Sequence, residues 1–137
     1  EEPVFNVLAW TSKKIRRTAR SSFAAETLAA IDAADAAIYI GFLHKELTGR
    51  QAPIFLATDS MNLKDHLQKK SNNTTERRLK VDLFSIKENL DRNEFKLLWV
   101  DGEQNIDDGF TKCAPQAQAV LEKALRSGRL PVKTAFA

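Results

Sequence analysis

The order of expected strands and helices predicts an α/β fold. Three apolar segments have strand composition, longer segments between them show helical spacing of apolar residues, and Ser, Gly or Pro stands at most boundaries. The chain has 137 residues, 43% of them hydrophobic and 28% charged, which is the balance of a globular protein. We expect one domain over residues 1–127, followed by a tail at residues 128–137.

Three segments are expected to form strands. Residues 4–10 are apolar and β-prone, and residues 54–57 follow Pro53 and predict a buried central strand. Residues 94–101 form the third apolar run, which ends at an Asp-Gly turn signal. Three strands are few for a free-standing sheet.

The longest expected helix covers the alanine-rich residues 23–47. Ser21 and Ser22 are suitable N-cap residues, and Gly49 is suited to end the helix. Four apolar residues at helical spacing are expected to face the core: Leu28, Ile31, Ile38 and Phe42.

Four shorter helices are expected after it. The first covers residues 61–69 after Ser60, and the second covers residues 75–92. The second helix has an apolar face made of Leu79, Leu83, Ile86 and Leu90. A short helix is expected at residues 106–112, and a last one at residues 115–126, between Pro115 and Gly128.

Positive charge is concentrated in two clusters. The formal net charge is only +3, from 21 Lys and Arg against 18 Asp and Glu. The first cluster comprises Lys13, Lys14, Arg16, Arg17 and Arg20, and the second comprises Arg77, Arg78 and Lys80. Such clusters can neutralise phosphates, and the alternative interpretation is an ordinary solvated face.

Three acidic residues stand at positions where catalytic sites form. Glu26 lies in the first turns of the long helix, Asp59 follows the central strand, and Asp108 follows the last strand. Converging carboxylates require a cation, and Mg²⁺ prefers oxygen ligands and suits phosphate chemistry. The structural alternatives are a favourable position near a helix N-terminus for Glu26 and caps for Asp59 and Asp108.

Several other functional classes are disfavoured by the sequence. Cys113 is the only cysteine, so no internal disulfide can form, and an intracellular, reducing compartment is expected. No apolar run is expected to span a bilayer, and no signal segment opens the sequence, so a membrane partner is not expected. The sequence also contains no Gly-rich phosphate loop and no recognisable Ser-His-Asp catalytic triad.

Three blocks, in order, resemble the ribonuclease H domain of copia-type LTR retrotransposon polyproteins. They are LAWTSKKIRRTARSSFAAETLAA, IFLATDSMNLKDHL and TTERRLKVDLFSIKENLDRNEFKLLWVDGEQNIDDGFTK. The resemblance covers residues 8–112 and implies a ribonuclease H-like mixed sheet with helices on both faces. It also implies an endonuclease that hydrolyses the RNA strand of an RNA–DNA hybrid with Mg²⁺ or Mn²⁺.

The resemblance assigns roles to residues of this chain. It implies that the catalytic acid of the long helix is Glu26, that of the central strand is Asp59, and the last one is Asp108. These three residues would bind the metal. Asp107 stands beside Asp108 and is a competing candidate for the last position. Nucleic-acid contacts are expected from Lys13, Lys14, Arg16, Arg17, Arg20, Arg77 and Arg78.

The sequence departs from the family at its beginning. The family's leading hairpin, which carries a fourth catalytic acid, should precede residues 4–10 and is missing from this sequence. One hypothesis is therefore a ribonuclease H-like enzyme with impaired cleavage. The alternative is a domesticated, non-catalytic remnant that acts as a nucleic-acid-binding or scaffold subunit. Without the hairpin, the strand expected at residues 4–10 has an open edge. In either case a protein partner or a swapped strand can cover that edge.

Overall fold

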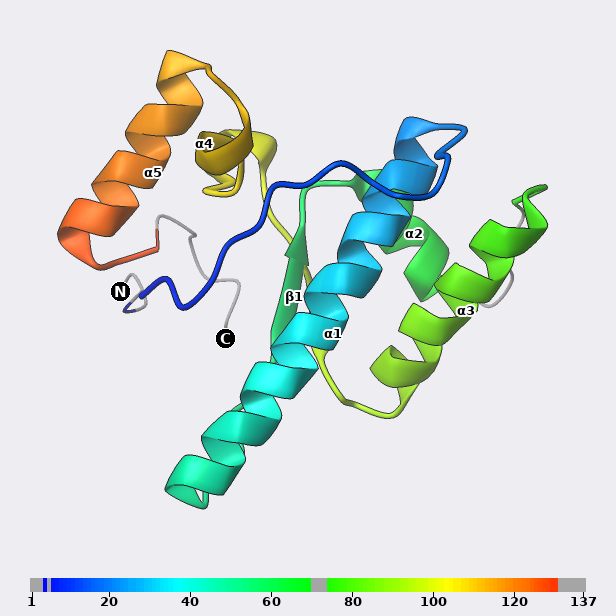
Figure 1. Ribbon diagram of the computed structural model, residues 1–137, viewed down its shortest axis with the longest axis horizontal. Helices are drawn as coiled ribbons and strands as arrows, with labels where there is room; N and C mark the ends of the chain where they lie inside the picture. Colours follow the sequence, from blue (N-terminus) through cyan, green and yellow to red (C-terminus); the bar gives the residue numbers. More distant parts are fainter. Residues whose placement is uncertain (1–3, 5, 70–73, 131–137) are drawn as a thin grey trace. The chain divides into compact units, whose positions relative to one another are not determined.

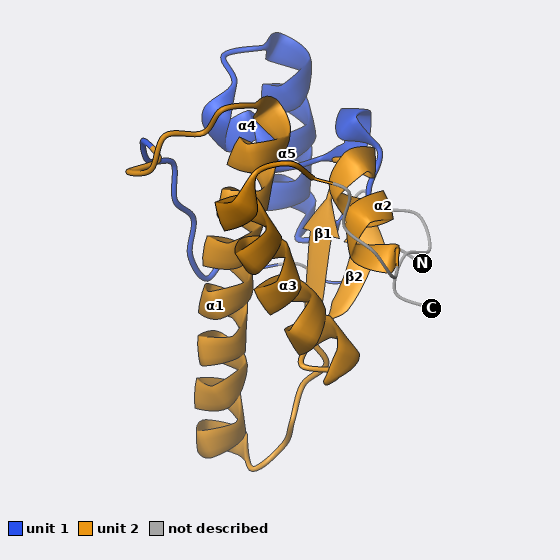
Figure 2. Cartoon of the chain, turned by 90° about the vertical axis from the view of Figure 1, so that its right-hand side faces the viewer, with its two compact units in different colours: residues 1–14, 100–137 blue, residues 15–99 orange. Residues whose placement is uncertain are grey.

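The computed structural model describes Val4, residues 6–69 and residues 74–130. The chain divides into two compact units (Figure 2). Unit 2 comprises residues 15–99, and unit 1 comprises residues 1–14 and 100–137. The expected single domain over residues 1–127 and its boundary with a tail stay predictions.

Unit 2 is an α/β unit. Its elements are α1 (Ser22–Thr48), β1 (Phe55–Thr58), α2 (Met61–Gln68), α3 (Arg77–Asp91) and β2 (Lys96–Trp99). Strands β1 and β2 pair in parallel, in a register that runs from Phe55 opposite Lys96 to Thr58 opposite Trp99. Helices α1 and α2 contact β1, and α3 packs against both helices (Figure 1). The α/β class expected from the sequence is therefore confirmed for this unit.

Helix α1 begins and ends where its sequence predicts. The Ser21 side chain accepts a hydrogen bond from the Ala24 amide at 3.1 Å, which satisfies one of the free N–H groups of the first turn. Gly49 adopts a left-handed conformation with a φ of 69°, and its amide donates to the Lys45 carbonyl at 2.8 Å. A left-handed residue favours glycine, so the end of α1 is encoded locally.

The first half of α1 packs closely because its buried residues are small: Ala24, Thr27, Ala30 and Ala34. The second half differs from the expected pattern, since Phe42 is 58% exposed and lies outside the core. A helix of 27 residues is about 40 Å long, whereas a strand of four residues covers about 13 Å. The second half of α1 therefore has less sheet to cover.

Helix α1 is long and apolar enough to cross a membrane when only length and composition are considered. This differs from the expectation that no apolar segment of the chain could do so. Buried helices of water-soluble proteins pass the same test, and α1 contributes Ala24, Ala30 and Ala34 to the core of unit 2. The absence of a membrane partner stays a prediction.

The core of unit 2 lies between the helices and the two strands. Leu63 and Leu67 of α2 are buried, as are Leu56 of β1 and Phe95 just before β2. From α3 come Leu79, Leu83 and Ile86, which are buried, and Leu90, which packs partly buried against them, so the predicted apolar face of this helix is confirmed.

Unit 1 contains a short 3₁₀ helix η1 (Gly102–Gln104), α4 (Asp108–Thr111) and α5 (Pro115–Ser127). The prediction for α5 is confirmed, since Pro115 opens the helix and Gly128 ends it with a φ of 64°. The expected helix at residues 106–112 is reduced to the four residues of α4.

The expected strand at residues 4–10 is wrong for the residues that the structure describes. Val4 forms an isolated antiparallel bridge with Arg129, and residues 6–10 adopt no regular structure. An apolar, β-prone segment forms a strand only when another strand accepts its backbone hydrogen bonds. Trp10 is accordingly 62% exposed instead of buried in a core, and its ring stacks on Phe110 at 5.3 Å.

A glycine at the packing surface of α4 gives a stability test for unit 1. A Cβ at Gly109 would lie 2.4 Å from Leu121 Cβ and 2.8 Å from the Ala117 carbonyl oxygen. Gly109→Ala is expected to lower the free energy of unfolding by about 1–3 kcal/mol, because backbone and Cβ atoms cannot move aside easily.

Gly41→Ala is the matched control. Its Cβ would meet mainly the end of the flexible Ile54 side chain, at 2.7 Å, and alanine favours the helix. Denaturant unfolding of both variants checks the comparison. A cost for Gly109→Ala no larger than that for Gly41→Ala would contradict the tight packing of α4 on α5.

Candidate nucleic-acid and metal site

Asp59 directly follows the carboxyl end of β1, as the sequence predicted. Its side chain is half-buried, and its backbone carbonyl accepts a hydrogen bond from Trp99 Nε1 at 3.3 Å. Ser60, and not Asp59, caps α2, because the Ser60 side chain accepts from the Leu63 amide at 3.3 Å. The structural alternative for Asp59, a helix cap, is therefore wrong.

Glu26 lies in the second turn of α1, between the buried residues Ala24 and Thr27, and is itself exposed. Figure 1 shows that α1 begins at the end of unit 2 towards which β1 points. Glu26 and Asp59 therefore belong to the same end of this unit. Glu26 lies beyond the first turn, so the local interpretation as a favourable charge at the helix terminus has less support.

Asp108 belongs to unit 1 and is the first residue of α4. Its Oδ2 atom forms an ion pair with Lys112 Nζ at 2.8 Å, one helical turn later, and its side chain is 18% exposed. The neighbouring Asp107 is the N-cap residue but makes no side-chain capping hydrogen bond. The N-cap interpretation of Asp108 is therefore wrong, and its ion pair with Lys112 is the local structural role that it does have.

Carboxylate oxygens are the ligands that Mg²⁺ and Mn²⁺ prefer, so the three acids have suitable chemistry for such an ion. Among residues 6–69 and 74–130 and Val4, no group of three or more His, Cys, Asp or Glu side chains is placed to hold a metal. The convergence of Glu26, Asp59 and Asp108 on a shared metal stays a prediction.

The two basic clusters are joined by a long-range ion pair in unit 2. Arg17 donates to Asp82 of α3 through both terminal nitrogens, with Nη1 at 3.5 Å from Oδ1 and Nη2 in contact with Oδ2. The Asp82 side chain is only 15% exposed. The hydrogen bond with Asp82 raises the pKa of the Arg17 guanidinium, and the negative charges of Asp82 and Glu76 add to this effect.

This ion pair attaches the segment that carries Arg16 and Arg20 to α3, the helix that carries the second cluster. Arg78 stands one helical turn before Asp82, on the same face of α3. Arg16 and Arg20 are exposed neighbours of Arg17, and Arg77 and Lys80 are exposed on α3. Lys13 and Lys14 belong to unit 1, so the first predicted cluster is divided between the two units.

Asp82 is a functional candidate that the sequence analysis missed. Its position four residues after Arg78 suggests a local ion pair within α3, which is a common arrangement on helix surfaces. Its observed partner, Arg17, is 65 residues away, and one sequence carries no signal for that pairing.

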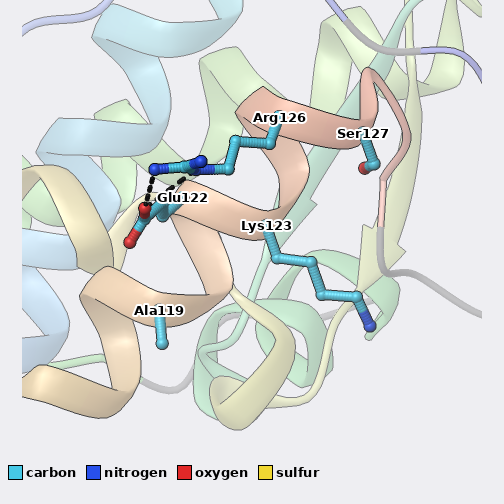
Figure 3. Close-up of a pocket in the computed structure, with 5 residues that line it drawn as sticks. All are labelled: Ala119, Glu122, Lys123, Arg126 and Ser127. Carbon is cyan, nitrogen blue, oxygen red and sulfur yellow. Dashed lines mark hydrogen bonds and ion pairs between the residues drawn. The ribbon is translucent and has the colours of Figure 1, made fainter.

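A shallow depression in unit 1 lies on the surface of α5. Its lining comes from this one helix: Ala119, Glu122, Lys123, Arg126 and Ser127 (Figure 3). Glu122 and Arg126 form an ion pair across one helical turn, at 2.7 Å. None of the predicted site residues lines this depression, and its charged pair has an ordinary role on a helix surface.

Comparisons with known proteins found no family model, no curated protein and no solved structure that matches this chain.

Proposed function

We propose that this chain is a ribonuclease H-like domain that binds RNA–DNA hybrids and, when its catalytic set is complete, hydrolyses the RNA strand with two metal ions. The observation that carries the proposal is the gathering of acidic and basic residues at one end of unit 2. Figure 1 shows α1 and α3 both starting at the end towards which β1 points. This end includes Glu26 and Asp59, together with the basic residues beside the starts of the two helices.

The chemistry of these residues supports phosphodiester binding. Exposed Arg and Lys side chains attract the nucleic-acid backbone, and the N-terminal ends of α1 and α3 add partial positive charge. Glu26 and Asp59, with Asp108 from unit 1, would hold Mg²⁺ or Mn²⁺. The metal would activate a water molecule and stabilise the leaving oxygen of the phosphodiester.

The proposal includes a limit on the activity of residues 1–137 alone. The resemblance implies a fourth catalytic acid on a preceding hairpin, and the sequence supplies the other three. We expect residues 1–137 to bind the hybrid and to cleave it only when the fourth acid is also present. The non-catalytic alternative rests on the same basic surface, without cleavage.

Metal-dependent hybrid cleavage tests the enzymatic part of the proposal. Any cleavage of the RNA strand should require Mg²⁺ or Mn²⁺ and should fall to background with Asp59→Asn. Asp91→Asn is the matched control, because Asp91 is the last residue of α3 and is exposed. Both effects are measured with an end-labelled RNA–DNA hybrid, with RNA duplex and DNA duplex as comparison substrates.

The outcomes separate the two functions. Cleavage that Asp59→Asn abolishes and Asp91→Asn preserves supports the enzyme. Hybrid binding without metal-dependent cleavage, even when upstream sequence is added to the chain, supports the non-catalytic alternative. A chain that does not bind the hybrid at low salt contradicts the enzyme and the nucleic-acid-binding form of the alternative, and leaves a scaffold role.

A further inference from the structure

We propose that Asp82 is a positioning residue that fixes residues 15–20 against α3, so that Arg16, Arg20 and Arg78 form one phosphate-binding surface. This inference rests on the proposed function and deepens it, because it names the residue that builds the nucleic-acid surface of unit 2. It assigns a positive contribution to a negatively charged residue, which is the reverse of what charge alone predicts.

The first argument is the range of the contact. The Arg17–Asp82 pair joins residues that are 65 positions apart. Three further ion pairs connect positions four residues apart along one helix, as Arg92 and Glu88 do at 2.7 Å. Pairs of that kind contribute little to tertiary structure, whereas the Arg17–Asp82 pair ties a loop to a helix.

The second argument is that residues 15–20 have few other anchors. They form no helix or strand, and Arg16, Arg17 and Arg20 are exposed. Ala19 is the one residue of this segment that packs against the core of unit 2. The Arg17–Asp82 pair is thus a second attachment point, two residues from the first, and together they restrict how the segment can turn.

The third argument is electrostatic. Arg17 contacts Asp82 of α3, and the like charges of two basic clusters repel each other when they share one surface. Asp82 lies four residues after Arg78 and offsets part of this repulsion. Without the carboxylate, residues 15–20 would lose this attachment to α3 and the two basic clusters could separate.

The same geometry limits the electrostatic repulsion between the Asp82 carboxylate and a bound phosphate. Its side chain is 15% exposed, and two of the Arg17 nitrogens face its oxygens. The carboxylate is therefore mostly shielded from a bound phosphate. The exposed charges that remain available to the nucleic-acid backbone include Arg16, Arg20 and Arg78.

A description based on net charge and the positioning role of Asp82 predict opposite changes in hybrid affinity when the carboxylate is removed. Asp82→Asn deletes one negative charge, so a description based on net charge predicts tighter hybrid binding. The positioning account predicts about tenfold weaker binding at 0.1 M salt, which corresponds to one lost phosphate contact, and a salt dependence that is less steep by about 0.9. Fluorescence anisotropy of a labelled RNA–DNA hybrid over a series of salt concentrations measures both quantities.

Glu88→Gln is the matched control, because it deletes the same charge from the same helix and breaks only the local pair with Arg92. Its affinity for the hybrid should be unchanged or higher. The charge-swapped double variant, Arg17→Asp with Asp82→Arg, keeps the net charge and can reform the pair. It should recover most of the affinity that Asp82→Asn loses, and it remains informative if Asp82→Asn does not fold.

The possible failures can be told apart. If the wild-type chain binds the hybrid, and Asp82→Asn has the same affinity and salt dependence as Glu88→Gln, the positioning role is wrong. The proposed function is not contradicted by that result. If the double variant folds but binds the hybrid no better than Asp82→Asn, the ion pair between positions 17 and 82 does not determine hybrid affinity, and the positioning role is wrong. If the wild-type chain does not bind the hybrid, the proposed function and this inference both fail.

Discussion

The triple variant Arg16→Gln, Arg20→Gln and Arg78→Gln is expected to lose most of its affinity for an RNA–DNA hybrid. Each arginine that neutralises a phosphate releases condensed counterions, so its removal flattens the dependence of the logarithm of affinity on the logarithm of salt concentration. Three lost contacts should make this slope less negative by about 2.7 and lower the affinity by a factor of about 500 at 0.1 M salt. The measurement is a salt titration of hybrid binding.

A matched variant with three exposed basic residues outside the proposed surface provides the control. Lys45, Arg92 and Arg126 are exposed on the last turn of α1, after α3 and on α5. Their replacement removes the same net charge and should change the slope much less. Equal effects of the two triple variants would mean that hybrid binding depends on net charge and not on the surface around Asp82.

Phe95→Ala is expected to have the largest effect on stability, a loss of about 3–5 kcal/mol in the free energy of unfolding. Phe95 is 2% exposed and is among the largest fully buried side chains. It belongs to the core cluster that also contains Leu63 and Leu83, so its loss leaves a cavity among side chains from α2 and α3. A loss of this size is a large part of the stability of a small unit and should unfold much of the population.

Phe84→Ala is the control for this prediction. Phe84 lies on α3 and is 66% exposed, so its replacement should change the free energy of unfolding by less than about 1 kcal/mol. Urea unfolding followed by circular dichroism compares the two variants. Similar losses for Phe95→Ala and Phe84→Ala would contradict the core described for unit 2.

Local signals in the sequence predicted the helices well. Ser21, Gly49 and Gly128 stand where α1 and α5 begin or end, because capping depends on a few neighbouring residues. The spacing of Leu79, Leu83 and Ile86 predicted the buried face of α3, since a helix repeats every 3.6 residues whatever its surroundings.

Features that depend on distant partners were not predictable in the same way. The strand expected at residues 4–10 requires a paired neighbour, and Phe42 would be buried only if another element covered the second half of α1. The Arg17–Asp82 pair likewise depends on how the loop before α1 meets α3. Sequence reasoning thus placed Glu26 and Asp59 on the correct elements but could not identify Asp82 as the partner of Arg17.

Mn²⁺ titration followed by NMR is the most direct test of the proposal that Glu26, Asp59 and Asp108 bind a shared divalent cation. Bound Mn²⁺ broadens the signals of nearby nuclei, so the account predicts early broadening at these three residues and much later broadening at Glu88 and Glu122. Asp59→Asn should abolish the early broadening at Glu26 and Asp108. Broadening that begins elsewhere, or that is unchanged by Asp59→Asn, would contradict a shared metal site.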